Sequence, residues 1–282
     1  MKIYNKEINE ENLVQLLHKI KNKPIVYVDD SFLLKHVKSY IEQNVACIDL
    51  INNGNVKNKK IKDLIKHVRA KVRKVYGLFQ DDRIQKRDSL LDDYEMNKKR
   101  ESVVKILQLH LSTKERISYM EELYDKIFSV TGKPKSVLDL GAGLNPLTYP
   151  WMNINSKYYA VEFNKGDVDF INRFFKIEKI KGEAVKFDLL IEYSEIKKYK
   201  VDICFLFKVL DSLERVQRYI SYEIMRAVDA KFIVVSFPLR TVTGRTMRQE
   251  QRNWFEKLLE RLDFKYETFS FKNEIFYVCS NK

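Results

Sequence analysis

The stretch VLDLGAGLNP, residues 137–146, decides the fold class of this 282-residue chain. Apolar residues and one acid, Asp139, run into a turn that contains Gly141 and Gly143. This order is typical of a buried parallel strand that ends in a ligand-binding turn. Pro146 stands where the dinucleotide-binding pattern G-x-G-x-x-G has its third glycine, and no P-loop lysine follows. The turn therefore predicts a nucleotide-like ligand that needs no pyrophosphate cradle.

Strand-like and helix-like segments alternate after a turn at residues 131–134. Strands are expected at residues 136–141, 157–164, 183–190, 201–210 and 231–238. Helices are expected at residues 211–229 and 249–262, and two last strands meet at Asn273 with no helix between them. We therefore expect an α/β fold, with a Rossmann-like, mostly parallel, doubly wound sheet and an antiparallel C-terminal hairpin.

Two of the expected strands end in acidic residues. Glu162 ends the second strand, where its carboxylate can accept hydrogen bonds from both hydroxyls of a ribose. Asp188 ends the third strand, where it can accept a hydrogen bond from an adenine amino group. A ligand with an adenosine but no pyrophosphate indicates S-adenosylmethionine (SAM), whose methionine part would face Asp139 and the backbone from Gly141 to Gly143. The alternative is an ordinary strand-to-helix turn with surface acids.

Positive charge is concentrated in residues 57–74, which hold nine lysines and arginines and one acid in a chain of net charge +13. Apolar residues recur at helical spacing in this stretch, so it predicts an amphipathic helix with a cationic outer face. That face would include Lys62, Lys66, Arg69 and Arg73. Neighbouring like charges repel one another, and a nucleic-acid phosphate backbone would offset the repulsion. The alternative is a solvated face without a partner.

The apolar spacing is mostly helical before residue 130, and no Gly/Ser linker interrupts it. We expect a helical, basic, RNA-binding domain at residues 1–130 and a SAM-dependent methyltransferase domain at residues 131–282. The loop from Arg240 to Arg252 is a second basic candidate for RNA contact.

Several classes of protein are disfavoured by the composition. No apolar run approaches the roughly 20 residues of a membrane span, and the N-terminus lacks the apolar core of a signal peptide. Cys47, Cys204 and Cys279 are far apart and form no C-x-x-C pair, so neither a zinc site nor a disulfide framework is indicated. We expect a cytoplasmic protein with no metal site and no membrane contact.

The chain also resembles one family over about residues 111–262. The resemblance is carried by LSTKERISYMEELYDKIF, SVLDLGAGLNPLTYPWM, YYAVEFNKGDVDFINRFF, CFLFKVLDSLERVQR and VVSFPLRTVTGR…WFEKLL, in the same order and spacing. It is similar to the 16S rRNA guanine-N7 methyltransferases of the aminoglycoside-resistance type, which modify the decoding region. The first 100 residues resemble that family only in being helical and basic.

The resemblance implies roles for particular residues. Arg116 matches an arginine that approaches the cofactor carboxylate. Gly141, Glu162, Asp188 and Leu189 match cofactor positions.

Two further matches concern catalysis, and four positions depart from the family. Lys208 matches a lysine that ends the fourth strand, and Phe237 lies in a segment beside the target base. Ala142 replaces a cysteine, and Lys114 replaces an arginine. The family pattern L-P-x-L-E-Q-Q loses its proline and one glutamine after Leu210.

The implied reaction needs few protein groups. Guanine N7 has an in-plane lone pair and no proton, so no general base is required, and orientation becomes the main task. An aromatic side chain such as Phe237 or Trp151 would hold the unstacked base, although Phe237 fits a core role equally well and Trp151 fits a packing role better. We expect a monomer that acts on the assembled small ribosomal subunit. The alternatives are another rRNA or tRNA site, or a non-catalytic RNA-binding protein that retains the fold.

Overall fold

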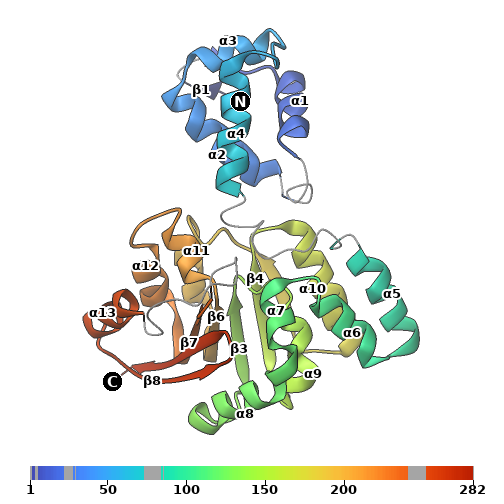
Figure 1. The fold of residues 1–282 in the computed structure, drawn as a ribbon, viewed down its shortest axis with the longest axis vertical. Coiled ribbons are helices and arrows are strands. Elements are labelled where there is room, and N and C mark those ends of the chain that lie inside the picture. Colours follow the sequence, from blue (N-terminus) through green and yellow to red (C-terminus); the bar gives the residue numbers. More distant parts are fainter. Residues whose placement is uncertain are drawn as a thin grey trace. The chain divides into compact units, whose positions relative to one another are not determined.

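The computed structural model describes residues 2–3, 6–21, 28, 30–72, 84, 86–240 and 252–281. The chain forms two compact units, Met1–Asp82 and Arg83–Lys282, which are both drawn in Figure 1. Two of the predicted RNA contacts, Arg73 and residues 241–251 of the basic loop, lie outside the described residues.

Short helices make up most of the described part of Met1–Asp82. They are α1 (Glu10–Ile20), α2 (Asp30–Gln43), α3 (Ala46–Asn52) and α4 (Lys59–Val72), beside the antiparallel pair β1 (Lys2–Ile3) and β2 (Lys6–Glu7). Asn9 caps α1, because its side chain accepts a hydrogen bond from the backbone N–H of Asn12 at 3.0 Å. This cap fixes the residue at which α1 begins.

Helix α4 confirms the predicted amphipathic helix. Its buried side chains lie on one stripe and are Ile61, Leu64, Val68 and Val72. Lys62 and Lys66 are exposed on the remaining surface. The helix is held by its apolar stripe, as expected for an amphipathic surface helix.

A seven-stranded sheet organises the unit Arg83–Lys282, with strand order β5-β4-β3-β6-β7-β9-β8. The strands are β3 (Ser136–Leu140), β4 (Lys157–Glu162), β5 (Gly182–Lys186), β6 (Lys200–Phe207), β7 (Asp229–Pro238), β8 (Phe264–Phe271) and β9 (Glu274–Asn281). Strands β3 to β7 pair in parallel, whereas β9 pairs antiparallel with both β7 and β8. The predicted doubly wound sheet with an antiparallel C-terminal hairpin is confirmed.

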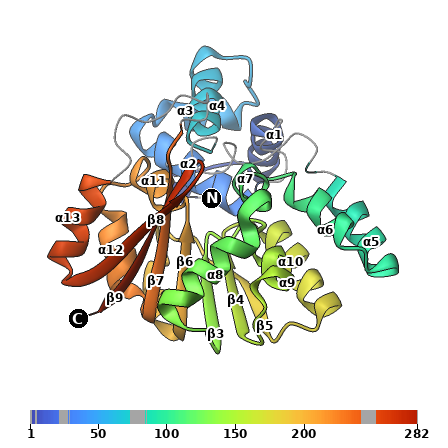
Figure 2. The same ribbon diagram turned by 60° about the horizontal axis from the view of Figure 1, so that its bottom comes forward.

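Helices cover both faces of this sheet. They are α5 (Arg87–Asn97), α6 (Arg100–Leu107), α7 (Leu111–Arg116), α8 (Met120–Thr131), α9 (Tyr149–Met152), α10 (Lys165–Glu178), α11 (Leu210–Glu214), α12 (Ile220–Ala227) and α13 (Asn253–Arg261). Alternate residues of β3 enter two separate cores, since Val137 packs with α5, α6, α8 and α10, and Leu138 packs with α11, α12 and α13. Figure 2 shows these two groups of helices on opposite sides of the unit.

The predicted domain boundary near residue 130 requires correction. The compact units divide between Asp82 and Arg83, and residues 84–130 belong with the sheet. The physical reason is that Leu91 and Val103, from α5 and α6, share one apolar core with Val137 of the sheet. Helical spacing showed which residues are buried but not what covers them.

Some element boundaries also differ from the expectations. Strand β5 ends at Lys186 rather than at residue 190, and the helix expected at residues 211–229 is two helices, α11 and α12. Tyr219, between them, has a left-handed φ of 68°, which interrupts the helical path. Within the described part of the chain, no helix is both long enough and apolar enough to cross a membrane.

Candidate active site

The carboxyl ends of β3, β4, β6 and β7 meet at one edge of the sheet, where the strand order reverses between β3 and β6. Open α/β sheets bind ligands at such a switch point. Most of the predicted site residues lie on or directly after these strands.

The glycine turn after β3 needs glycine at its first position. Gly141 has φ 63°, and a Cβ added there would lie 2.7 Å from Val209 Cγ2. The backbone N–H groups of Gly141 and Ala142 both donate to the carbonyl oxygen of Val161, at 2.9 and 3.1 Å. The turn is therefore attached to the end of β4, and it approaches Val209 too closely for any larger residue.

Glu162 closes the next strand directly beside this turn. Its Oε1 accepts a hydrogen bond from the Gly143 N–H at 2.6 Å, and its Oε2 accepts one from the Phe163 N–H at 3.1 Å. Burial raises the pKa of Glu162 to about 8, and Asp167 adds to the increase, whereas the two N–H donors oppose it. The carboxylate is thus fixed next to Gly143 and keeps further acceptor capacity for a ligand hydroxyl.

Asp139 lies inside a buried polar network and is 1% exposed. Its Oδ2 accepts hydrogen bonds from Tyr158 Oη at 2.7 Å and from Asn145 Nδ2 at 2.9 Å. Burial raises the pKa of Asp139 to about 7, against the opposing effect of these donors and of Arg116. Its described contacts fix the segment that follows the glycine turn, and its predicted position facing the methionine part stays a prediction.

Arg116, at the end of α7, is 2% exposed and forms a bidentate ion pair with Glu274 of β9. Its Nη2 lies 2.6 Å from Glu274 Oε1 and its Nε lies 3.0 Å from Glu274 Oε2. Its Nη1 lies 3.4 Å from Asn145 Oδ1, and its guanidinium carbon lies 4.6 Å from the centre of the Phe207 ring. Arg116 therefore connects the C-terminal hairpin with the segment that follows the glycine turn.

Lys208 follows β6 directly and has φ 59°, which is unusual for a residue other than glycine. Its backbone N–H donates to Ser236 O and Ser236 Oγ, both at 3.1 Å, so β7 holds this conformation. Its Nζ lies 2.5 Å from Glu115 Oε2 and 3.3 Å from Glu274 Oε2. The structure thus brings Lys208 and Arg116 to the same buried carboxylate.

The predicted adenine contacts lie in a turn beyond the sheet. Asp188 is two residues past the end of β5, where its backbone N–H donates to Glu192 Oε2 at 2.8 Å. Its Oδ1 accepts a hydrogen bond from the Leu190 N–H at 3.0 Å, and Leu189 is 7% exposed in an apolar core. The expectation that the third strand ends in Asp188 is wrong, because the strand is shorter.

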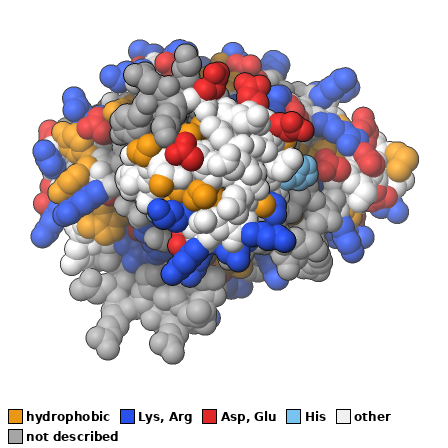
Figure 3. Space-filling view, turned by 90° about the horizontal axis from the view of Figure 1, so that it is seen from above, with side chains coloured by type: hydrophobic (Ala, Val, Ile, Leu, Met, Phe, Trp, Pro, Cys, Tyr) orange, Lys and Arg blue, Asp and Glu red, His pale blue; other side chains and the backbone are white. Residues whose placement is uncertain are grey.

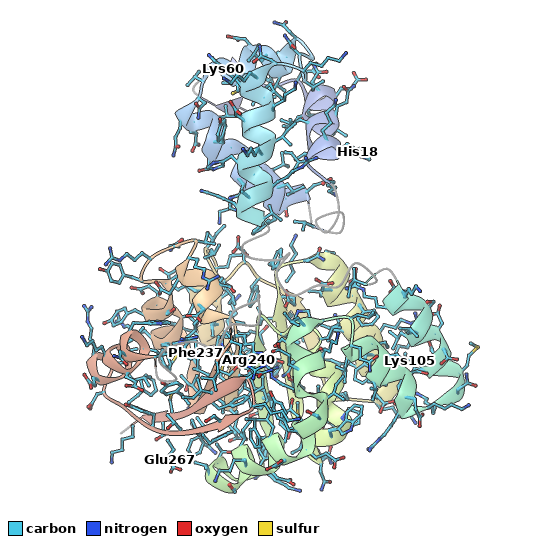
Figure 4. All side chains as sticks on the ribbon, in the orientation of Figure 1. His18, Lys60, Lys105, Phe237, Arg240 and Glu267 are labelled. Carbon is cyan, nitrogen blue, oxygen red and sulfur yellow. The ribbon has the colours of Figure 1, made fainter. Side chains whose placement is uncertain are left out.

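Phe237 packs in the aromatic core rather than on the surface. It is 0% exposed, and its ring centre lies 5.0 to 5.9 Å from those of Trp254, Phe255 and Tyr277. Figure 4 labels Phe237 within the sheet unit, near Arg240. Of the two roles that the sequence left open for Phe237, this packing supports the core role and not contact with a base. Trp151 is half-buried, with the guanidinium carbon of Arg100 5.3 Å from its ring centre.

The basic residues of α4 divide into two kinds. Lys62 and Lys66 are exposed, and with Lys19 and Arg69 they line a cavity of about 570 Å³. Arg69 is instead tied to α1, since its Nη2 and Nε donate to the carbonyl oxygens of Lys19 and Ile20 at 2.5 and 3.1 Å. Figure 3 shows exposed lysine and arginine side chains interspersed with acidic ones.

Three residues at the site were missed by the sequence analysis. Glu274 and Glu115 bind the two cations, and His110 packs on the turn, where a Cβ on Gly143 would lie 3.2 Å from His110 Nε2. Burial lowers the pKa of His110 to about 4, and Arg116 lowers it further. Glu115 could have been found from the sequence, because it is the neighbour of Arg116. Glu274 could not, because it lies 158 residues from Arg116 in the sequence.

Comparisons with known proteins agree with this geometry. A family model for the ribosomal RNA methyltransferase FmrO matches residues 58–278. A 16S rRNA (guanine(1405)-N(7))-methyltransferase of Proteus mirabilis is 31% identical over 189 residues, which are 64% of this chain and 66% of the relative. An enzyme of the same name from Micromonospora echinospora is 25% identical over 229 residues, which are 77% of this chain and 82% of the relative.

Solved structures support the same fold. The 16S rRNA methyltransferase RmtF, in complex with S-adenosyl-L-homocysteine, matches with a TM-score of 0.77 at 23% identity. That match covers 98% of this chain and 100% of RmtF. The 16S rRNA methylase RmtB matches with a TM-score of 0.72 at 22% identity, covering 98% of this chain and 100% of RmtB.

Proposed function

Since this chain belongs to the ribosomal RNA methyltransferase family that the FmrO model describes, we propose that it transfers a methyl group from SAM to 16S rRNA. The acceptor proposed is N7 of the guanine at position 1405, the nucleotide for which relatives from Proteus mirabilis and Micromonospora echinospora are named. Modification of this site would confer aminoglycoside resistance, as the sequence resemblance implies.

The observation that carries the proposal is the position of Glu162 at the end of β4, held by the N–H of Gly143 at 2.6 Å. A carboxylate fixed beside a glycine turn suits the two hydroxyls of a ribose. The turn without a third glycine suits a ligand that has no pyrophosphate.

The remaining cofactor contacts follow from the same edge of the sheet. The backbone from Gly141 to Gly143 would face the methionine part, and Arg116 would face its carboxylate. Asp188 and Leu189 would hold the adenine. These residues fit SAM because they offer a carboxylate for the ribose, a cation for the carboxylate and an apolar side chain for the ring.

Catalysis requires orientation and no proton transfer from the acceptor. The sulfonium of SAM supplies an activated methyl group, and guanine N7 attacks with its lone pair. The protein's contribution is to hold N7 in line with the methyl group, and orientation can supply roughly 7–11 kcal/mol of the barrier reduction. Lys208, directly after β6, would order the pocket, because its side chain is only 4% exposed and its Nζ is paired with Glu115. Phe237 is not assigned to base contact because its ring is buried in the core.

The RNA partner is proposed to contact both units. Lys62 and Lys66 are exposed on α4 and supply candidate phosphate contacts. Arg69 fits a structural role better, since its guanidinium is bonded to α1. In the basic loop, Arg240 is exposed, whereas Arg252 donates to the carbonyl oxygen of Pro238 at 2.7 Å. Arg73 and residues 241–251 remain proposed contacts.

The substrate proposed is the assembled small subunit, bound by a monomer in the cytoplasm. The experiment is a methyl-transfer assay with tritiated SAM and three acceptors: purified small subunits, naked 16S rRNA and bulk tRNA. We expect labelled small subunits and weak labelling of the other two. Equal labelling of naked rRNA would contradict the proposed substrate form, and the absence of label in all three would contradict the enzymatic function.

A further inference from the structure

Glu274, the first residue of β9, is a fully buried carboxylate that none of the proposed roles above uses. It lies opposite Pro238 in the β7–β9 pair, at the edge of the sheet that carries the candidate site. Its Oε1 accepts hydrogen bonds from Arg116 Nη2 at 2.6 Å and from Ser236 Oγ at 2.5 Å. Its Oε2 accepts one from Arg116 Nε at 3.0 Å and lies 3.3 Å from Lys208 Nζ.

The bidentate contact fixes the plane of the Arg116 guanidinium. Nε and Nη2 are directed at Glu274, and Nη1 is directed at Asn145, which follows the glycine turn. The ring of Phe207 lies on the guanidinium, 4.6 Å from its central carbon. Nη1 of Arg116 therefore faces the segment that follows the glycine turn.

Charge balance is a second reason why a carboxylate is needed at position 274. The side chains of Arg116 and Lys208 are 2% and 4% exposed, and the only other carboxylate that pairs with Lys208 among the described residues, Glu115, is 27% exposed. Burial would raise the pKa of Glu274, but Arg116 and Lys208 outweigh it and lower that pKa below its usual range. Glu274 therefore remains ionised between two buried cations, as such cations require.

We propose that Glu274 is a positioning residue that aims Arg116 at the carboxylate of SAM. The inference rests on the proposed function, because it assumes that SAM is the ligand of the glycine turn. A purely structural ion pair would stabilise the hairpin without affecting how the cofactor is bound.

The test combines Glu274→Gln with a control on α13 that contacts the same hairpin. Glu256→Gln is the matched control, because Glu256 accepts a hydrogen bond from Tyr277 Oη of β9 at 2.9 Å and has no described contact with Arg116 or Lys208. SAM affinity is measured by calorimetry, thermal stability by circular dichroism, and the KM values for SAM and for small subunits by methyl transfer.

Glu274→Gln should weaken SAM binding roughly 10-fold, within the range seen for coupled neighbouring residues. The KM for SAM should rise and the KM for small subunits should stay unchanged. Glu256→Gln should lower only the melting temperature. Unchanged SAM affinity in a folded Glu274→Gln protein would overturn the proposal.

A second comparison covers the case in which Glu274→Gln alone fails to fold. In an Arg116→Gln background the buried charges are balanced when Glu274 also becomes Gln. If Glu274 acts through Arg116, then Arg116→Gln and the double variant should bind SAM equally. A further loss of about 10-fold in the double variant would overturn the proposal. Failure of the wild-type protein to bind SAM would instead contradict the proposed function.

Discussion

Replacement of Glu162 by Gln should weaken SAM binding while leaving the sheet folded. The amide oxygen can keep the hydrogen bond from the Gly143 N–H, which Glu162 Oε1 accepts at 2.6 Å. The amide nitrogen would then face the Phe163 N–H, which is 3.1 Å from Oε2, so two donors would oppose each other. The variant also loses one of the acceptors available to the ribose hydroxyls.

The magnitude follows from the contacts and from the raised pKa. Two hydrogen bonds to a charged group contribute roughly 1.5–3 kcal/mol each. Because burial raises the pKa of Glu162 to about 8, ionising it at pH 7 costs about 1.4 kcal/mol, which reduces the gain. The net loss expected for Glu162→Gln is about 2 kcal/mol, or roughly 30-fold in affinity.

Calorimetry of SAM binding at pH 7 measures this loss directly. Glu178→Gln is a suitable control, because Glu178 accepts a hydrogen bond from Tyr94 Oη at 2.8 Å and lies on α10, away from the turn. The control should bind SAM as tightly as the wild type. Equal SAM affinity for Glu162→Gln and wild type would refute the assignment of Glu162 to the ribose.

Further predictions address pH, RNA binding and the turn. SAM affinity of the wild type should rise by about 10-fold or more from pH 6.5 to 9, since Glu162 must lose a proton that its raised pKa retains, and the Gln variant should show no such rise. The same raised pKa should make the free energy of unfolding of the ligand-free protein fall as the pH rises from about 4 to about 8, as chemical denaturation would measure. Lys66→Glu should weaken filter binding of small subunits and reduce the salt slope by somewhat less than one unit, whereas Arg69→Gln should lower the melting temperature, because it frees the last carbonyls of α1. Gly141→Ala should lower stability by about 1–3 kcal/mol in denaturant titration, because its Cβ would lie 2.7 Å from Val209.

The fold was predictable because its signals are local. A buried strand that ends in Gly141 and the alternation that follows it are enough to predict a doubly wound sheet, and β3 to β9 confirm it. The division between domains was not predictable in this way. Helical spacing marks Leu91 as buried, but only the tertiary structure shows that it packs with the sheet.

In the candidate site, too, local patterns could be predicted from the sequence and long-range contacts could not. Glu162 was found from sequence because it ends a strand next to the glycine turn in the fold. Glu274 was missed because its partner Arg116 is 158 residues away and no local pattern connects them. Phe237 and Arg69 carry the side chains expected of RNA contacts, yet the structure places one in an aromatic core and the other on the end of α1.

The function proposed for this chain is methylation of guanine N7 at position 1405 of 16S rRNA in the assembled small subunit. The most direct measurement treats subunits with the enzyme and SAM, cleaves the extracted rRNA chemically at N7-methylguanine, and locates the break by primer extension. We expect one new enzyme-dependent stop at guanine 1405, absent when SAM is omitted and reduced for Glu162→Gln at limiting SAM. A methyl group on another nucleotide, or on another atom of that guanine, would contradict the proposed specificity.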